Sequence, residues 1–489
     1  MSAAGRTILM IASEAVPFAK TGGLADVAGA LPLALARLGH EVTLVLPRYR
    51  GLATQPGGEP ISITMGGRTS RVAVAEQRMA DRVRAVLLDC PELFDRDGLY
   101  ATGGKDYADN ARRFGVFVRA ALETAARSGR PVDVVHAHDW QAGLAPVYLK
   151  TFYAPHPVFT GAASVFTIHN LAYQGLFPPE WLTELDLGWP VFTIDGLEFW
   201  GKISFLKAGV NFSNLVTTVS PTYADEIRTA EAGSGFDGIL RAKGADLVGV
   251  LNGIDADVWN PATDPHIPQP FSADDLTGKA AAKRHLLESM GLATDHGAMA
   301  RPLVGMVSRL VNQKGFDLLA EISDELMALD AAWVLLGSGE ARYETLWRSL
   351  ASRFPDRIGV RIGFDDALAH LIEAGADLFL MPSRFEPCGL NQMYSQRYGT
   401  IPVVRATGGL DDTVTQWNSR TRKGTGFKFR DATAPALLKA LRQALSTFGD
   451  QEAWRSLQLA GMARDFSWDA SAVHYARLYE RAIRHKRQG

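Results

Sequence analysis

Short apolar runs without polar–apolar alternation recur along the chain, and each ends in polar or glycine residues before a helical pattern. In the first half they cover residues 8–13, 42–47, 132–138, 164–169 and 215–220. Runs of this kind, separated by helices, are typical of parallel strands that are buried on both faces. The same succession begins again at residues 303–308, 333–337, 358–363, 378–383 and 401–405. The sequence therefore predicts an α/β chain with two Rossmann-like, doubly wound parallel sheets.

The boundary between the two series is expected after a further apolar run at residues 247–251. Asn-Gly, Asn-Pro and Asp-Pro pairs interrupt any regular element in residues 252–270. From about residue 468 the apolar spacing is helical, and we expect this last helix to pack back on the first domain. A length of 489 residues suits two domains better than one. We therefore predict one domain over residues 1–255 with helix 468–489, and a second over residues 256–467.

Charge and composition limit the classes of partner. Lysine plus arginine (51) nearly balance aspartate plus glutamate (53), so no long-range field recruits nucleic acid or an anionic membrane. Two cysteines, Cys90 and Cys388, cannot form a disulfide framework and suit a reducing cytosol. The run at residues 8–12 is too short for a secretory signal, and no run approaches the length of a membrane span. We expect a cytoplasmic protein with no nucleic-acid or membrane partner.

Two glycine motifs follow predicted strands, where ligands of open parallel sheets bind. The first is Lys20-Thr-Gly-Gly-Leu-Ala-Asp-Val27. Gly22 and Gly23 allow the backbone to approach a ligand, and a helix N-terminus presents N–H groups to an anion. A glycine turn with a surface lysine explains this motif equally well when it is taken alone. The near echo Thr407-Gly-Gly-Leu-Asp-Asp-Thr-Val414 favours function, because two glycine-rich helix starts suit a diphosphate and its sugar.

Two cations follow the run at residues 303–308. Arg309 and Lys314 lie on one short turn that can aim both at a single point. A cation about 4 Å from a leaving diphosphate contributes roughly 4 kcal/mol at an effective dielectric near 20. It would act where charge develops in the reaction. An ordinary surface pair is the alternative interpretation.

The run at residues 378–383 delivers Arg384-Phe-Glu-Pro-Cys-Gly-Leu-Asn391. Pro387 suits the first turn of a helix, because its missing N–H costs nothing there. We expect that helix to offer the amides of Cys388, Gly389 and Leu390 to a phosphate. Glu386 beside an anion must face something else, such as sugar hydroxyls. The alternative is a helix-start carboxylate that the helix dipole stabilises.

Polar groups at three strand ends of the first domain leave two interpretations open. They are His136-Ala-His-Asp-Trp140, His169 with Asn170, and Ser220. His136, His138, Asp139 and His169 could form a metal site. Buried, hydrogen-bonded histidines are the commoner outcome. Two other motifs are set aside as loop chemistry: Gly233-Ser-Gly-Phe-Asp-Gly238 follows a helix rather than a strand, and Asp255-Ala-Asp257 lies in the predicted linker.

Together these motifs resemble the bacterial glycogen synthases and plant starch synthases, which use a nucleotide diphosphate glucose. No single motif is specific to that family, but their combination is. They span residues 20 to about 414, so the resemblance covers nearly the whole chain. The matching segments are Lys20-Thr-Gly-Gly-Leu-Ala-Asp-Val, His136-Ala-His-Asp-Trp, Thr167-Ile-His-Asn-Leu-Ala-Tyr-Gln-Gly, Asn252-Gly-Ile-Asp, Ser308-Arg-Leu, Gln313-Lys-Gly, Ser383-Arg-Phe-Glu-Pro-Cys-Gly-Leu and Thr407-Gly-Gly-Leu.

The resemblance implies a retaining glycosyltransferase of the B type, with two Rossmann-like domains facing across a cleft. The donor would be ADP-glucose, the acceptor the non-reducing 4-hydroxyl end of an α-1,4-glucan, and no metal or other cofactor would be required. The catalytic residues implied are Glu386, His169, Asp139, Arg309 and Lys314, with the His169 backbone carbonyl beside an oxocarbenium-like centre. The donor-binding residues expected are Lys20, Gly22, Gly23, Asp26, Asn252, Cys388, Gly389, Leu390, Thr407, Gly408, Gly409 and Phe364. On the acceptor side we expect Glu14, Trp140 and Tyr100.

One position departs from a pattern common among retaining transferases of this fold. Many carry a second glutamate eight positions after the first, and here that position is Tyr394. The synthases resembled also tend to lack this acid, so Tyr394 favours them over sucrose-synthase-like or trehalose-forming relatives.

Three other functions stay open at this point. One is a metal-dependent hydrolase that uses His136, His138, Asp139 and His169. Another is a non-catalytic glucan-binding protein, although such a protein has no use for a diphosphate site. A phosphorylase is less attractive, because nothing marks a pyridoxal-phosphate lysine.

Overall fold

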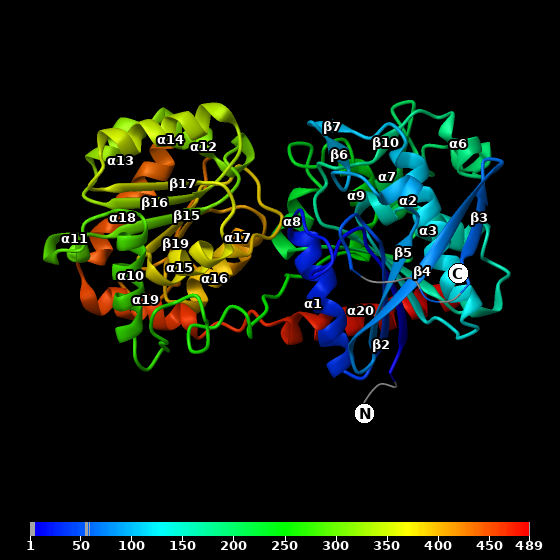
Figure 1. The fold of residues 1–489 in the computed structure, drawn as a ribbon, viewed down its shortest axis with the longest axis horizontal. Coiled ribbons are helices and arrows are strands. Elements are labelled where there is room, and N and C mark those ends of the chain that lie inside the picture. Colours follow the sequence, from blue (N-terminus) through cyan, green and yellow to red (C-terminus); the bar gives the residue numbers. More distant parts are fainter. Residues whose placement is uncertain (1–4, 54–56, 58, 489) are drawn as a thin grey trace. The chain divides into compact units, whose positions relative to one another are not determined.

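The computed structural model describes residues 5–53, 57 and 59–488 and divides into two compact units (Figure 1). Unit 1 contains the described residues up to Val219, then Ala224–Gly253 and those from Trp468 onward. Unit 2 contains Ser220–Tyr223 and Ile254–Ser467. The chain therefore leaves unit 1 after Gly253, where we had predicted residue 255, and re-enters it at Trp468.

Within its described residues, unit 1 is built on a nine-stranded sheet. From one edge the order is β14 (Leu247–Gly249), β13 (Leu215–Thr218), β9 (Ala163–Ile168), β8 (Val134–His138), β1 (Thr7–Ile11), β2 (Glu41–Pro47), β5 (Val83–Asp89), β4 (Arg68–Ala80) and β3 (Ile61–Met65). From β14 to β5 every neighbouring pair is parallel. The central strand is β1, where Ile8 lies opposite Val42 on one side and Val134 on the other.

The edge formed by β3 and β4 differs from the predicted all-parallel sheet. Strand β4 pairs antiparallel with β5, and β3 pairs antiparallel with β4. Along β3 the side chains alternate between buried and exposed, which is the pattern of a strand with one face in water. That alternation explains why this edge has no continuous apolar run.

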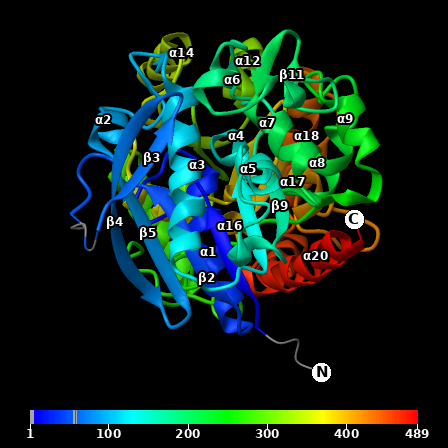
Figure 2. The ribbon, with the colours of Figure 1, turned by 90° about the vertical axis from the view of Figure 1, so that its right-hand side faces the viewer.

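Helices cover both faces of the sheet in unit 1. On one face, Ile8 and Met10 pack with Val27 of α1 (Gly23–Arg37) and with Tyr479 of α20 (Trp468–Gln488). Figure 2 shows α20 running beside α1 and β9. On the other face, α3 (Asn110–Arg127) contacts β1, β2 and β5. The last helix of the chain is thus part of the core of unit 1.

Unit 2, all of whose residues are described, contains a six-stranded sheet. Its order is β17 (Ile358–Ile362), β16 (Ala332–Gly337), β15 (Leu303–Val307), β18 (Leu378–Met381), β19 (Ile401–Arg405) and β20 (Phe427–Phe429), and every pair is parallel. In chain order this is 3-2-1-4-5-6, the Rossmann arrangement. Trp333 and Leu335 pack on one face, and Val334 and Leu336 on the other.

Shorter helices in the first half of the chain include α4 (Asp139–Ala142), α8 (Pro221–Glu226) and α9 (Asp237–Ala242). The helices of unit 2 include α10 (Thr277–Ser289), α11 (His296–Ala300), α12 (Phe316–Glu321), α14 (Ala341–Arg353), α15 (Asp366–Gly375), α16 (Asn391–Arg397), α17 (Gly408–Thr413), α18 (Ala434–Phe448) and α19 (Gln451–Met462). None of the helices in the described part of the chain is both long and apolar enough to cross a membrane.

The two sheets reverse their strand order at equivalent places, which confirms the predicted pair of Rossmann-like folds. In unit 1 the order reverses between β1 and β8, and in unit 2 between β15 and β18. Ligands of such sheets bind outside the carboxyl ends of the strands at the reversal. Candidate site residues are therefore expected after these four strands.

Candidate active site

The turn after β1 holds a carboxylate that organises its surroundings. Glu14 is buried and accepts hydrogen bonds from the Thr21 backbone amide, from Thr21 Oγ1 at 2.7 Å and from the Tyr100 hydroxyl at 2.6 Å. Gly22 and Gly23 follow Thr21 at the start of α1, and both are exposed with open space above their Cα atoms. Glu14 thus holds the turn in place, and the backbone of Gly22 and Gly23 is exposed.

Lys20, on the same turn, pairs with Asp26 in the first turn of α1. Lys20 Nζ lies 2.7 Å from Asp26 Oδ1, and the lysine side chain is about half exposed. An exposed pair of this kind contributes little to stability. Lys20 is therefore able to exchange Asp26 for an incoming anion at small cost.

The three residues expected at the acceptor lie together. The Tyr100 hydroxyl donates to Glu14, and the Tyr100 and Trp140 rings have centroids 6.3 Å apart. Trp140 follows Asp139, the first residue of α4, and is buried. The cluster offers an aromatic surface and a carboxylate, which is a combination suited to a sugar.

The two histidines of β8 and the histidine that follows β9 are all hydrogen-bonded. His136 uses Nδ1 on the Tyr479 hydroxyl at 2.8 Å and Nε2 on Thr167 Oγ1 at 2.6 Å. His138 Nδ1 lies 2.9 Å from His169 Nε2. Burial lowers the pKa of His136 and of His169 to about 3, so these imidazoles are neutral at neutral pH.

These contacts do not support the metal-dependent hydrolase. Both ring nitrogens of His136 are already hydrogen-bonded, so it has no lone pair for a metal. Among the described residues, the cluster with metal-ligand spacing is instead His266, Asp366 and His370 of unit 2. Sequence spacing could not show that Tyr479, from the far end of the chain, would form a hydrogen bond with His136.

Asp139 combines an unusual backbone conformation with an unusual pKa. Its φ is +55°, a left-handed conformation that aspartate tolerates better than most residues. Its Oδ1 accepts the His169 backbone amide at 2.7 Å. Burial raises the pKa of Asp139 to about 7, against the opposing effect of hydrogen bonds from the His169 and Asn170 amides. Asp139 therefore orients the backbone of the residue expected beside the sugar.

In unit 2, Lys314 and Glu386 meet at the carboxyl ends of β15 and β18. Lys314 Nζ lies 2.5 Å from Glu386 Oε2, and Ser383 Oγ donates to the same oxygen at 3.0 Å. Glu386 is buried. Gly315 makes this approach possible, because its φ is +78° and a Cβ there would collide with the backbone oxygen of Pro382. Arg309, on the same turn, is exposed and donates to Gln313 Oε1 at 3.4 Å.

Ser383 is a site residue that the sequence analysis did not single out. Its hydroxyl helps to fix the Glu386 carboxylate. Its place at the end of the run 378–383 was the available signal, because strand-end residues of Rossmann sheets line the ligand site.

The prediction that a helix starts at Pro387 is wrong. Helix α16 begins at Asn391, and Cys388, Gly389 and Leu390 precede it in a turn. Gly389 has a φ of +70°, which a right-handed helix does not contain. The amides of these three residues therefore belong to a tight turn around Glu386 rather than to a helix N-terminus.

The two glycine motifs are not equivalent. Gly408 and Gly409 are buried, and the Gly409 amide donates to the backbone oxygens of Glu386 and Pro387 at 3.2 Å. Thr407, also buried, is the N-cap residue of α17. Asp412 accepts from the Thr222 amide and hydroxyl at 2.9 and 2.7 Å. The Thr407–Val414 motif thus forms hydrogen bonds to the turn that holds Glu386, whereas Gly22 and Gly23 are exposed to solvent.

Three further predicted or noted positions lie apart from these clusters. Phe364 follows β17 and is 89% exposed. Asn252 follows β14 in unit 1, and its Oδ1 is buried with no hydrogen-bond partner among the described residues. Tyr394, at the position of the second acid, stacks on Trp259 with ring centroids 3.8 Å apart.

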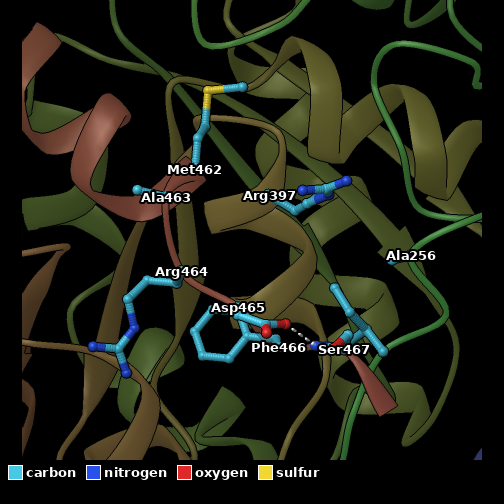
Figure 3. A pocket seen from close by; sticks show the side chains of 9 residues that line it. Ala256, Arg397, Met462, Ala463, Arg464, Asp465, Phe466 and Ser467 are labelled. Carbon is cyan, nitrogen blue, oxygen red and sulfur yellow. Dashed lines mark hydrogen bonds between the residues drawn. The ribbon is translucent and has the colours of Figure 1, made fainter. Parts of the chain in front are cut away.

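A cavity of unit 2 lies elsewhere (Figure 3). It is lined by Ile254, Ala256, Arg397, Met462, Ala463, Arg464, Asp465, Phe466 and Ser467. Within it the Ser467 amide donates to Asp465 Oδ1 at 2.9 Å. None of the predicted site residues is among the described residues that line this cavity.

Comparison with known families defines the class of the protein. A profile described as Starch synthase catalytic domain matches residues 7–242, and one described as Glycosyl transferases group 1 matches residues 295–456. With two Rossmann-like sheets and polar strand ends at both reversals, the chain is a glycosyltransferase.

Individual relatives define the family. The chain is 52% identical over 474 residues to a glycogen synthase of Anaeromyxobacter dehalogenans, covering 96% of this chain and 98% of that protein. It is 49% identical over 478 residues to a glycogen synthase of Koribacter versatilis, covering 97% and 98%. The catalytic domain of starch synthase IV from Arabidopsis thaliana, solved bound to ADP and acarbose, matches with a TM-score of 0.90 and 35% identity, covering 98% and 100%. The chain belongs to the glycogen synthase family.

Proposed function

We propose that this chain is a hexosyltransferase that moves glucose from ADP-glucose to the non-reducing 4-hydroxyl of an α-1,4-glucan, with retention of configuration. The observation that carries the proposal is the buried Glu386 carboxylate, held by Lys314 and Ser383 beside the reversal of strand order in unit 2. A relative solved with ADP supports the choice of nucleotide.

The donor diphosphate is assigned to cations at strand ends. Lys314 and Arg309 follow β15, and Lys20 follows β1. When the bond from glucose C1 to the diphosphate oxygen breaks, negative charge develops on that oxygen, and fixed cations stabilise it. The exposed Gly22 and Gly23 backbone is assigned to the same donor, and the exposed Phe364 ring to the nucleobase. Binding of an anion at Lys314 would draw this side chain away from Glu386 and leave the carboxylate for sugar hydroxyls.

The acceptor glucan is assigned to Glu14, Tyr100 and Trp140. Their shared hydrogen bonds and ring contacts fix an aromatic surface with a buried carboxylate at its edge. We thus assign the acceptor to unit 1 and the nucleotide sugar mainly to unit 2.

Retention is proposed to arise without a covalent enzyme intermediate. The acceptor oxygen forms its bond to C1 on the face that the diphosphate leaves, and the departing phosphate takes the hydroxyl proton. The His169 backbone carbonyl, whose peptide Asp139 orients, lies in this scheme beside the electron-poor C1. A glycosidase would need two paired carboxylates on either side of the bond, and Glu386 is instead paired with a lysine.

The chemistry is proposed to need no metal, and the protein to act in the cytoplasm. The hydrogen-bonded histidines and the cationic side chains Arg309 and Lys314 support the first point. Cys90 and Cys388, neither of which forms a disulfide, support the second. Turnover that survives exhaustive chelation, and fractionation of the native protein, test the two points.

A donor panel tests the proposed function. Purified enzyme is given glycogen with ADP-, UDP- or GDP-glucose, and release of the nucleoside diphosphate is followed. We expect ADP-glucose to give the highest kcat/KM and the glucan to gain α-1,4-linked residues by NMR. Absence of nucleoside diphosphate release from all three donors would instead support a non-catalytic glucan-binding protein.

A further inference from the structure

A second cluster of ligating side chains lies in unit 2, among residues to which the proposed reaction assigns no part. One ligand atom from each of His266, Asp366 and His370 lies within 4.8 Å of the other two. Asp366 and His370 are four residues apart on α15, so they project from the same face of that helix. His266 comes from the segment that precedes α10. The His266 and Asp366 side chains are exposed and His370 is buried, so an ion could enter from solvent.

The buried histidine is oriented by a carboxylate behind it. Asp264 Oδ2 lies 2.7 Å from His370 Nδ1 and accepts the Tyr398 hydroxyl at 2.5 Å. Asp264 Oδ1 accepts the His266 backbone amide at 2.9 Å.

The hydrogen bond to Asp264 fixes the tautomer of His370. The carboxylate accepts a hydrogen bond from the Nδ1–H group, and the lone pair is left on Nε2, on the opposite edge of the ring. Metal-binding histidines almost always have such a carboxylate or carbonyl behind them. His370 therefore has both the tautomer and the ring orientation that a metal ligand needs.

Aromatic stacking holds the same ring in place. Trp259 lies parallel to His370, with ring centroids 3.7 Å apart and an interplanar angle of 8°. Tyr394 lies parallel to Trp259 at 3.8 Å. The His370 ring is therefore fixed in rotation as well as in tautomer, which reduces the cost of ordering it around an ion.

We propose that His266, Asp366 and His370 form a Zn²⁺ site. Two imidazoles and one carboxylate are ligands typical of zinc, whereas Mg²⁺ and Ca²⁺ prefer sites made of oxygen atoms. Three protein ligands leave a fourth position for water. The ion would join the segment carrying His266 to α15, and it would stabilise unit 2 without entering the glucosyl-transfer reaction.

The test uses the full-length, untagged protein, treated with chelator and then titrated with Zn²⁺ in a calorimeter. We expect one Zn²⁺ per chain, and a rise in Tm on zinc addition, because binding to the folded state alone stabilises it. His266→Ala and Asp366→Asn should each weaken zinc binding at least about tenfold. His296→Ala removes an exposed histidine of the same unit and serves as the matched control, with zinc affinity unchanged.

Cobalt gives a second readout that does not depend on stability. Co²⁺ in the wild-type site should give the strong visible absorption of a four-coordinate ion, and His266→Ala should lose it. Circular dichroism spectra equal to wild type would show that the variants fold. Zinc binding of equal affinity in wild type, His266→Ala and Asp366→Asn, or no zinc binding to folded wild-type protein, would overturn the site.

Discussion

Glu386 is a buried acid whose charge is balanced by a single lysine. Its side chain is 8% exposed, that of Lys314 is 19% exposed, and their charged atoms are 2.5 Å apart. Removing one partner of a buried pair leaves an uncompensated charge, at a cost of about 3 kcal/mol or more. We therefore expect Lys314→Met to lower the free energy of unfolding by about 3 kcal/mol, measured by urea denaturation without substrate.

The double variant separates this electrostatic effect from lost packing. Glu386→Gln removes the charge that Lys314 balances, so Lys314→Met with Glu386→Gln should be more stable than Lys314→Met alone. An additive cycle, in which the two substitutions do not compensate one another, would contradict the pairing.

Asp139 should make stability depend on pH. Its pKa is about 7 when folded and near 4 in an unfolded chain, so the folded state binds the proton more tightly. Stability therefore falls as the pH rises from about 4 through about 7. Asp139→Asn keeps a residue that tolerates a positive φ and removes the charge. It should raise the free energy of unfolding by about 2 kcal/mol at about pH 8, and by much less at about pH 5.

The same variant should lose activity while it gains stability. The ionised carboxylate accepts the His169 amide more strongly than a neutral amide oxygen does, so kcat should fall in Asp139→Asn. Asp257→Asn, at an exposed aspartate, is the control and should change neither property. Equal stability differences at both pH values would show that Asp139 does not titrate in this range.

Residue types at strand ends could be predicted from the sequence, but their partners could not. Lys314 and Glu386 follow apolar runs of the sequence, and each does follow a strand of unit 2. Their ion pair depends on Gly315 approaching Pro382, a contact between different strand ends. The motif shared by Gly22 and Gly408 suggested similar roles, yet burial of Gly408 and Gly409 separates them.

Helix α20 is joined to the sheet of unit 1 by a buried hydrogen bond. The Tyr479 hydroxyl lies 2.8 Å from His136 Nδ1, and both side chains are fully buried. Tyr479→Phe leaves the imidazole nitrogen without its partner. We expect a loss of about 1–2 kcal/mol in the free energy of unfolding, measured by thermal or urea denaturation.

A matched substitution at the surface serves as the control for this loss of stability. Tyr173 is 55% exposed, so Tyr173→Phe should change the free energy of unfolding by less than about 0.5 kcal/mol. If Tyr479→Phe were as stable as Tyr173→Phe, the bond from β8 to α20 would contribute nothing.

Elements with continuous apolar runs were predictable, and elements with mixed patterns were not. The predicted run 401–405 coincides with β19, and 42–47 falls within β2. The β3–β4 edge was missed because its alternating residues mark a half-exposed antiparallel pair. The start of α16 was misplaced because Pro387 allows a helix start but Gly389, at φ +70°, does not continue one.

For the whole molecule, two successions of strand and helix indicate two Rossmann-like sheets, and both sheets have the strand order of that fold. The nine-stranded sheet of unit 1 is larger than predicted within its described residues, because an antiparallel pair extends one edge. Fold alone does not determine the reaction. The family comes from relatives about half identical over nearly the whole chain.

The central claim is that Glu386 and Lys314 act on the transferred glucose and its diphosphate. Steady-state release of ADP from ADP-glucose with glycogen tests it most directly. Removal of one preorganised group that stabilises the charge of the transition state costs about 100- to 1,000-fold in kcat. We predict losses of that size for Glu386→Ala and Lys314→Ala, and wild-type turnover for the exposed control Asp257→Asn. Wild-type turnover in Glu386→Ala or Lys314→Ala would contradict the assignment.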